Sequence, residues 1–144
     1  MHLHHPRTLW LVLLALGLLL GGPIGCQDEV AEPGTEISAL MAAPNAYLGT
    51  PLILSGEVDA VWQPGVFTLQ DPDDASRNLT VISTVAALPL VKDDDLVQVT
   101  GELRLFRWAE IEREVDWELD PTIEVEIEGA PVFVAREVRK YGED

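Results

Sequence analysis

Two seven-residue stretches of this chain share one pattern, an apolar–polar alternation interrupted by a glycine. Residues 52–58 are LILSGEV and residues 97–103 are VQVTGEL, so both follow apolar-x-apolar-[Ser/Thr]-Gly-Glu-apolar. Alternation with a period of two is typical of β-strands, and a glycine within a strand often marks a bulge or a sharp bend at a barrel corner. Gly56 and Gly101 therefore indicate two strongly bent strands in a small closed sheet.

Further short strands are expected around these two, separated by turn signals such as Gln63-Pro64-Gly65. The alternation IEVEIE at residues 123–128 predicts an edge strand with its glutamates in water. The periodicity predicts strands over residues 52–62, 66–70, 79–83, 96–106, 123–128 and 131–138, helices over 36–42 and 108–117, a helical turn within 84–90 and loops over 71–77 and 92–95.

Five or six short strands with one to three short helices resemble an OB-fold, a small Greek-key barrel. Residues 37–138 are similar to small secreted bacterial OB-fold domains, with an "N-x-Y-x-G" lead-in at residues 45–49, an "F-x-L-x-D" strand at 67–71 and a "V-x-V-x-G" strand at 97–101. The resemblance implies a mainly β, OB-fold-like barrel. It implies no activity, because these motifs report strands and bends.

The N-terminus has the three-part layout of a secretory signal. Arg7 precedes residues 9–20, which are apolar apart from Gly17, and Gly21-Gly22-Pro23 then ends the run. A membrane-spanning helix needs about 20 apolar residues, whereas about 10–14 suit the core of a signal peptide. The sequence therefore predicts a signal peptide followed by an exported domain.

Cys26 is the single cysteine of the chain, and it stands where the apolar run gives way to acidic residues. Ile24-Gly25-Cys26 resembles the lipobox of bacterial lipoprotein signals, with Pro23 where that family usually has leucine. The resemblance implies that Cys26 carries acyl chains such as palmitate and anchors the protein in the bacterial cell membrane or outer membrane, facing the periplasm or the exterior. The expected parts are a signal peptide (1–25), a disordered acidic tether (26–35), the OB-fold-like domain (36–140) and a tail (141–144).

Charge argues against nucleic acid as a partner. All 25 acidic residues and eight of the nine lysines and arginines follow Cys26, so that part carries a net charge of −17, which repels phosphate backbones. OB-folds that bind nucleic acid use strands two and three with the loops after strands one and four. With Phe67 and Leu69 pointing inward, neither an aromatic nor a basic side chain is expected on that outer face, which then presents Thr68, Gln70, Thr80 and Ile82.

The residue types needed for common catalytic sites are missing after the predicted signal. The histidines His2, His4 and His5 all precede Cys26, so no histidine base or His–Cys zinc set remains. We therefore expect no cofactor and no enzymatic activity, with hydrolysis by a carboxylate pair the least favoured class.

Asp71, Asp73 and Asp74 are secondary candidates for binding a hard cation through oxygen ligands. Their segment lacks the glycine and the glutamate of an EF-hand loop, since Ser76 and Ile82 occupy those positions. A solvated turn is the favoured interpretation, and the same holds for the acidic run at residues 93–95.

Trp62, Trp108 and Trp117 lie at predicted strand or helix ends, where aromatic side chains usually pack against the core. A functional alternative is the rim of a groove beside the acidic connection between strands four and five, suited to a cationic peptide or protein face. The leading hypothesis is accordingly a lipid-anchored, non-enzymatic module that binds an envelope protein or a small cationic ligand. The alternative is a cation-binding or stress-linked envelope domain that uses its acidic loops.

Overall fold

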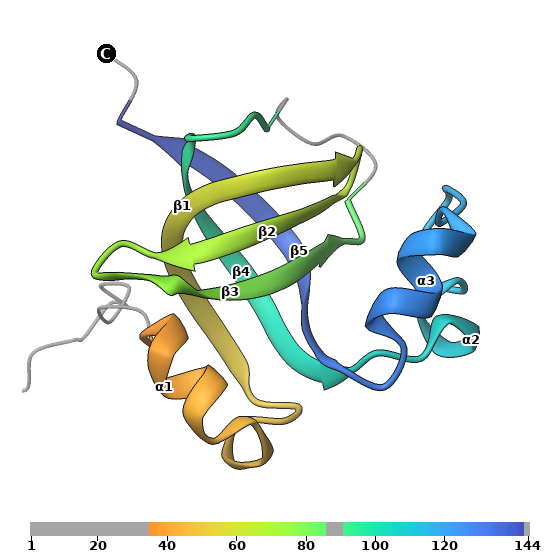
Figure 1. Ribbon diagram of the computed structural model, residues 1–144. Helices are drawn as coiled ribbons and strands as arrows, with labels where there is room; N and C mark the ends of the chain where they lie inside the picture. The colour runs from red at the N-terminus through yellow and green to blue at the C-terminus, as the bar shows by residue number, and fades with distance from the viewer. Residues whose placement is uncertain (1–34, 86–90, 143–144) are drawn as a thin grey trace, which may run out of the picture. The chain divides into compact units, whose positions relative to one another are not determined.

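The computed structural model describes residues 35–85 and 91–142, and within them a closed five-stranded barrel (Figure 1). The signal peptide, Cys26 and nearly all of the tether lie outside the described residues, as do most of the expected helical turn at 84–90 and the last two residues of the tail. The strands are β1 (Pro51–Gln63), β2 (Val66–Asp71), β3 (Asp74–Ser83), β4 (Leu96–Leu105) and β5 (Pro131–Tyr141).

The barrel closes in the order β1-β2-β3-β5-β4, with β4 also paired to β1. Every pair is antiparallel except β3–β5, which is parallel. The chain is thus mainly β and forms a small OB-fold-like barrel, which confirms the expected fold class. The interior holds alternate residues of the strands, including Phe67 and Leu69 as expected.

The two glycines of the repeated pattern lie where the barrel bends. β1 pairs with β4 from Pro51 to Glu57 and with β2 from Glu57 onward, so it changes partner beside Gly56. Gly101 is the residue at which β4 crosses β5 through an irregular register. A Cβ atom at Gly101 would lie 2.0 Å from the carbonyl oxygen of Val134. The expected irregularity is confirmed at Gly101, where the close approach of the two backbones requires a glycine.

One end of the barrel is closed by α1 (Ile37–Ala42), close to the predicted helix over residues 36–42. Ile37 and Leu40 of this helix are fully buried in the barrel interior. The backbone N–H of Ser38 donates to Asp71 Oδ2 at 3.2 Å, which ties α1 to the end of β2. A short 3-10 helix, η1 (Pro44–Ala46), leads from α1 toward β1.

The edge strand predicted over residues 123–128 is wrong, because this segment forms α3 (Pro121–Ile127). Pro121 occupies the first turn, where its missing N–H does no harm, and the Asp120 carboxylate caps the helix by accepting from the N–H of Thr122 at 2.7 Å. Ile123 and Ile127 are four residues apart and share a helix face toward the barrel, whereas Val125 is 81% exposed.

Two other boundaries differ from the prediction. The helix expected over residues 108–117 is only α2 (Trp108–Ile111), followed by turns and irregular chain up to α3. β3 begins at Asp74 rather than at residue 79, so most of the expected loop at 71–77 belongs to the β2–β3 hairpin. Between Gln70 and Asp71 the register of this hairpin shifts, which leaves residues 75–77 bulged and exposed.

Candidate functional site

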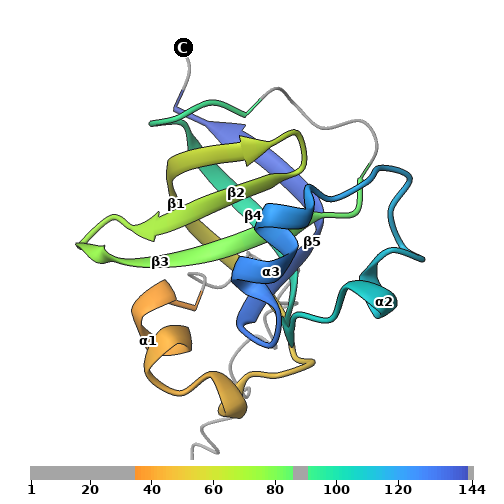
Figure 2. The ribbon, with the colours of Figure 1, turned by 45° about the vertical axis from the view of Figure 1, so that its right-hand side comes forward.

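The outer face of β2 and β3, which OB-folds commonly use for ligands, is covered in this protein at the end that holds Val66 and Ile82. Val66 and Ile82 lie opposite each other on these strands and are fully buried. Together with Val132 and Val134 of β5 they pack against the connection between β4 and β5, residues 107–130, which we call the strap (Figure 2). The expected outward direction of Ile82 is therefore confirmed, but its side chain meets protein instead of solvent.

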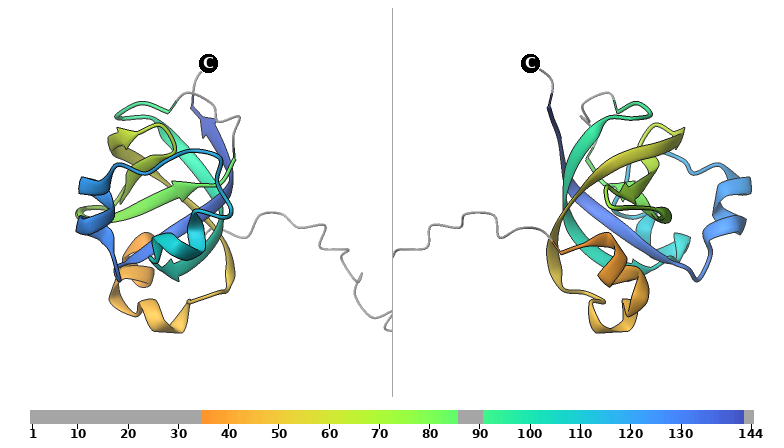
Figure 3. Two further views of the ribbon diagram at one scale, coloured as in Figure 1. Left: turned by 90° about the vertical axis from the view of Figure 1, so that its right-hand side faces the viewer. Right: turned by 60° about the vertical axis from the view of Figure 1, so that its left-hand side comes forward.

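Apolar residues at every fourth position hold the strap on this face. Three of them are buried and two are partly buried, and all five belong to one cluster with the outer faces of the strands. Figure 3 shows the strap along the side of the barrel and α1 at its end. The sequence reasoning missed this cover, although the spacing was visible in Ile111, Val115, Leu119, Ile123 and Ile127.

The β1–β2 turn fastens the middle of the strap through Gln63. The Gln63 Nε2 donates to the carbonyl oxygen of Glu118 at 3.1 Å, and its Oε1 accepts from the N–H of Asp120 at 2.9 Å. One side-chain amide thus satisfies a donor and an acceptor of the strap backbone, as a strand partner would. We call this pair of hydrogen bonds the Gln63 latch.

Trp117 forms a second attachment beside the Gln63 latch. Its indole Nε1 donates to the carbonyl oxygen of Ser83 at 3.3 Å. The ring lies over Gly65, since a Cβ atom there would be 3.3 Å from the indole. Because Gly65 has no side chain, the Trp117 ring can lie directly against its backbone.

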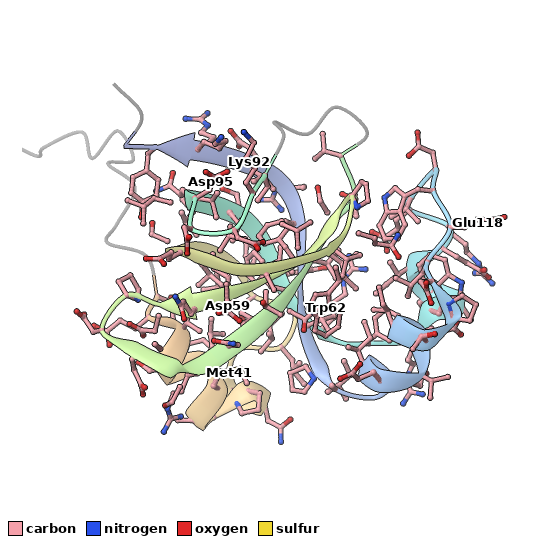
Figure 4. All side chains as sticks on the ribbon, turned by 45° about the horizontal axis from the view of Figure 1, so that its top comes forward. Met41, Asp59, Trp62, Lys92, Asp95 and Glu118 are labelled. Atoms are coloured by element: carbon pink, nitrogen blue, oxygen red, sulfur yellow. The ribbon has the colours of Figure 1, made fainter. Side chains whose placement is uncertain are left out.

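The three tryptophans proposed as a partner rim do not lie together. Trp108 and Trp117 are in contact, with ring centroids 5.8 Å apart, and Trp108 also stacks on Phe106 at 6.4 Å. Trp62 is 36% exposed and belongs to neither apolar cluster of the described residues. Figure 4 labels Trp62 on β1 and Glu118 on the strap. Two of the three rings therefore pack with the strap cluster, and Trp62 lies outside it.

The strap is strongly acidic and is anchored to β4 by one arginine. It contains nine acidic and two basic residues, a net charge of −7 over 24 residues. The Arg104 guanidinium contacts both carboxylate oxygens of Glu114, at 2.6 and 3.2 Å, and Glu102 at 2.6 Å. The hydrogen bonds to Glu114 and then to Glu102 raise the pKa of Arg104.

The candidate cation ligands Asp71, Asp73 and Asp74 lie in the β2–β3 hairpin, where two of them hold the turn. Asp71 Oδ1 accepts from the N–H of Asp73 at 2.9 Å, and this bond and the one from Ser38 lower the pKa of Asp71. Asp74 Oδ1 accepts from the N–H and hydroxyl of Ser76. These hydrogen bonds show that Asp71 and Asp74 stabilise the turn of the hairpin.

The acidic run at residues 93–95 also forms a turn, as expected. Asp94 has a positive φ of 71°, and the N–H of Lys92 donates to Asp95 Oδ2 at 2.8 Å. Lys140 of β5 pairs with the same oxygen at 3.1 Å. Figure 4 shows Lys92 and Asp95 together at the edge of the barrel away from Met41 of α1. The hydrogen bond from Lys92 is the largest cause of the lowered pKa of Asp95.

Across residues 35–85 and 91–142, no group of three or more histidine, cysteine or acidic side chains has metal-binding geometry. Within the same two ranges, no helix has the length and hydropathy to cross a membrane. Cys26, the predicted lipid attachment point, lies outside the described residues. Comparison of the chain with models of known protein families and with curated proteins gave no match.

Proposed function

We propose that this protein is a lipid-anchored, non-enzymatic binding module of a bacterial cell envelope. The observation that carries the proposal is Ile24-Gly25-Cys26, which follows the twelve-residue run 9–20 after Gly21-Gly22-Pro23. Its placement gives the single cysteine a chemical role, because a lone cysteine in an exported chain cannot form an internal disulfide. Several acyl chains on one residue supply the stable anchoring that a single chain does not.

A binding role suits the chemistry of the folded domain better than catalysis does. Its acidic residues are spread over strands, loops and the strap, and no histidine follows Cys26. The strap presents most of its carboxylates to solvent, and this distribution favours a cationic protein or ligand. The cation-binding alternative has less support, because the oxygens of Asp71 and Asp74 already accept local hydrogen bonds.

Mass spectrometry of the protein from membrane fractions tests the anchor. We expect the mature chain to begin at an acylated Cys26, and Cys26→Ser to leave an unprocessed, unacylated chain. Pro23→Leu introduces the residue that lipoprotein signals usually have at this position. As a control, this variant should yield at least as much processed protein as the wild type. A mature wild-type chain without acyl groups on Cys26 would show that the proposal is wrong.

The partner is tested by crosslinking in intact cells. A Glu112→Gln/Asp116→Asn variant removes two exposed charges from the strap, and Glu36→Gln/Asp73→Asn removes two from elsewhere on the domain. We expect a crosslinked envelope partner to be lost from the strap variant and retained by the control. Equal crosslinking by both variants would show that the partner does not bind through the charges of the strap.

A further inference from the structure

The strap combines a net charge of −7 with little regular secondary structure. Its regular structure consists of α2, with four residues, and α3, with seven. Helices this short are not stable on their own in water. Seven apolar side chains of the strap's 24 residues pack on the barrel. Three of them are buried, Ile111, Leu119 and Ile127, and four are only partly buried, Trp108, Val115, Trp117 and Ile123.

Ordering this segment costs conformational entropy for every residue that is fixed. The barrel strands offset that cost with continuous hydrogen-bonded ladders. The strap has no such ladder and is held by the apolar cluster, the Gln63 latch, Trp117 and the Arg104–Glu114 ion pair. Segments with few buried contacts open at a lower free energy than the core of the same protein. Detachment of the strap therefore requires less free energy than unfolding of the barrel.

Electrostatic repulsion acts against the closed strap. The strap has a net charge of −7 and is held against a domain that is itself acidic. Arg104 compensates one of its carboxylates directly, through Glu114. Repulsion among the other carboxylates is stronger at low ionic strength, because salt then screens it less. The Debye length is about 30 Å at 10 mM salt and about 8 Å at 0.15 M. Salt should therefore favour the closed state.

We propose that the strap is a charge-regulated cover: it detaches from the barrel as a unit and uncovers the apolar face of β2, β3 and β5, and screening or neutralisation of its carboxylates keeps it closed. The uncovered face consists of Val66, Ile82, Val132 and Val134. Val66 and Ile82 of this face belong to strands two and three, so the cover decides whether that part of the usual OB-fold ligand surface is accessible. This behaviour is independent of whether Cys26 carries a lipid.

Hydrogen–deuterium exchange of the full chain in a neutral detergent, followed by mass spectrometry of peptides, tests the cover. At 10 mM salt we expect amides in residues 107–130 to exchange at least about tenfold faster than those of the strands, and to slow by about threefold or more at 0.15 M salt. Exchange of the strap only together with the strands, or at a rate independent of salt, would overturn the proposal.

Two pairs of variants separate the cover from general destabilisation. Gln63→Ala removes the Gln63 latch and should raise exchange of the strap roughly tenfold without changing the strands, whereas Gln98→Ala on β4 should change neither. Glu112→Gln/Asp116→Asn should reduce the salt dependence of strap exchange, and Glu36→Gln/Asp73→Asn, with the same net charge change, should leave it as in the wild type. Equal effects within either pair contradict the proposal.

Discussion

A Cβ atom on Gly101 would lie 2.0 Å from the carbonyl oxygen of Val134, closer than any side chain tolerates. We predict that Gly101→Ala prevents β4 and β5 from pairing at this crossing and lowers the free energy of unfolding by at least about 3 kcal/mol, a loss outside the common range for point mutants. Urea unfolding followed by circular dichroism measures it.

Gly49→Ala is the matched control for this substitution. Gly49 has a φ of +74° but no atom near its missing Cβ, so the loss should stay near about 1 kcal/mol, the strain of an L residue in the left-handed region. Equal losses for Gly49→Ala and Gly101→Ala would mean that close approach of the backbones does not limit the barrel.

The exposures of Val125 and Ile127 distinguish the observed helix α3 from an edge strand. In a strand residues 123, 125 and 127 would share one face, whereas in the helix Val125 is 81% exposed and Ile127 is buried. Ile127→Ala should lower the free energy of unfolding by about 2–3 kcal/mol, and Val125→Ala should leave it unchanged or slightly raised because alanine favours helices. Similar losses at both positions would favour a strand.

Leu40 joins α1 to the barrel interior, and its side chain is fully buried. Leu40→Ala should therefore lower the free energy of unfolding by about 2–5 kcal/mol through lost burial and the cavity left behind. Leu48→Ala is the control, since Leu48 is 36% exposed, and should cost less than about 1 kcal/mol. If the two substitutions cost the same, α1 does not close the barrel in solution.

Substitution by phenylalanine should affect stability differently at Trp117 and at Trp62. Trp117→Phe removes the indole donor to the carbonyl oxygen of Ser83 and should cost about 1 kcal/mol. Trp62→Phe alters a partly exposed ring and should fall within about 0.5 kcal/mol of the wild type. Thermal unfolding of the two variants measures the difference, and a larger effect at Trp62 would contradict the assignment of Trp117 to the strap.

Acid should weaken the attachment of α1 through Asp71. Its pKa in the folded protein lies below the ordinary value of 3.8, because it accepts hydrogen bonds from the N–H groups of Asp73 and Ser38. The stabilisation is therefore fully present above about pH 4 and is lost as the pH falls through the lowered pKa.

Denaturant unfolding at several values of pH between 2 and 6 tests the role of Asp71. Asp71→Asn should unfold more easily than the wild type at pH 6 and show a smaller loss of stability below pH 4. Asp73→Asn is the control, because its neighbour Asp71 uses the backbone N–H of Asp73 and not its carboxylate. A wild-type acid dependence in Asp71→Asn would exclude Asp71 as its source.

Local pattern was sufficient for β1, β4 and the irregular crossing at Gly101. Alternation placed β1 and β4 to within one residue, and the glycine of the repeated pattern located the crossing at Gly101, because a period of two and a missing side chain both act within a single strand. The alternation IEVEIE misled for the same reason. Apolar residues at 123 and 127 suit one face of a strand and also one face of a helix, and Pro121 with the Asp120 cap favours the helix.

The sequence alone determined the charge, the absence of histidine after Cys26 and the lipobox-like end of the apolar run, since these depend only on which residues are present and in what order. Tertiary structure alone decided that the strap covers the outer face of β2 and β3. That outcome depends on contacts between residues far apart in the chain, such as Gln63 with Asp120 and Trp117 with Ser83, and such contacts exist only after the barrel has brought those segments together.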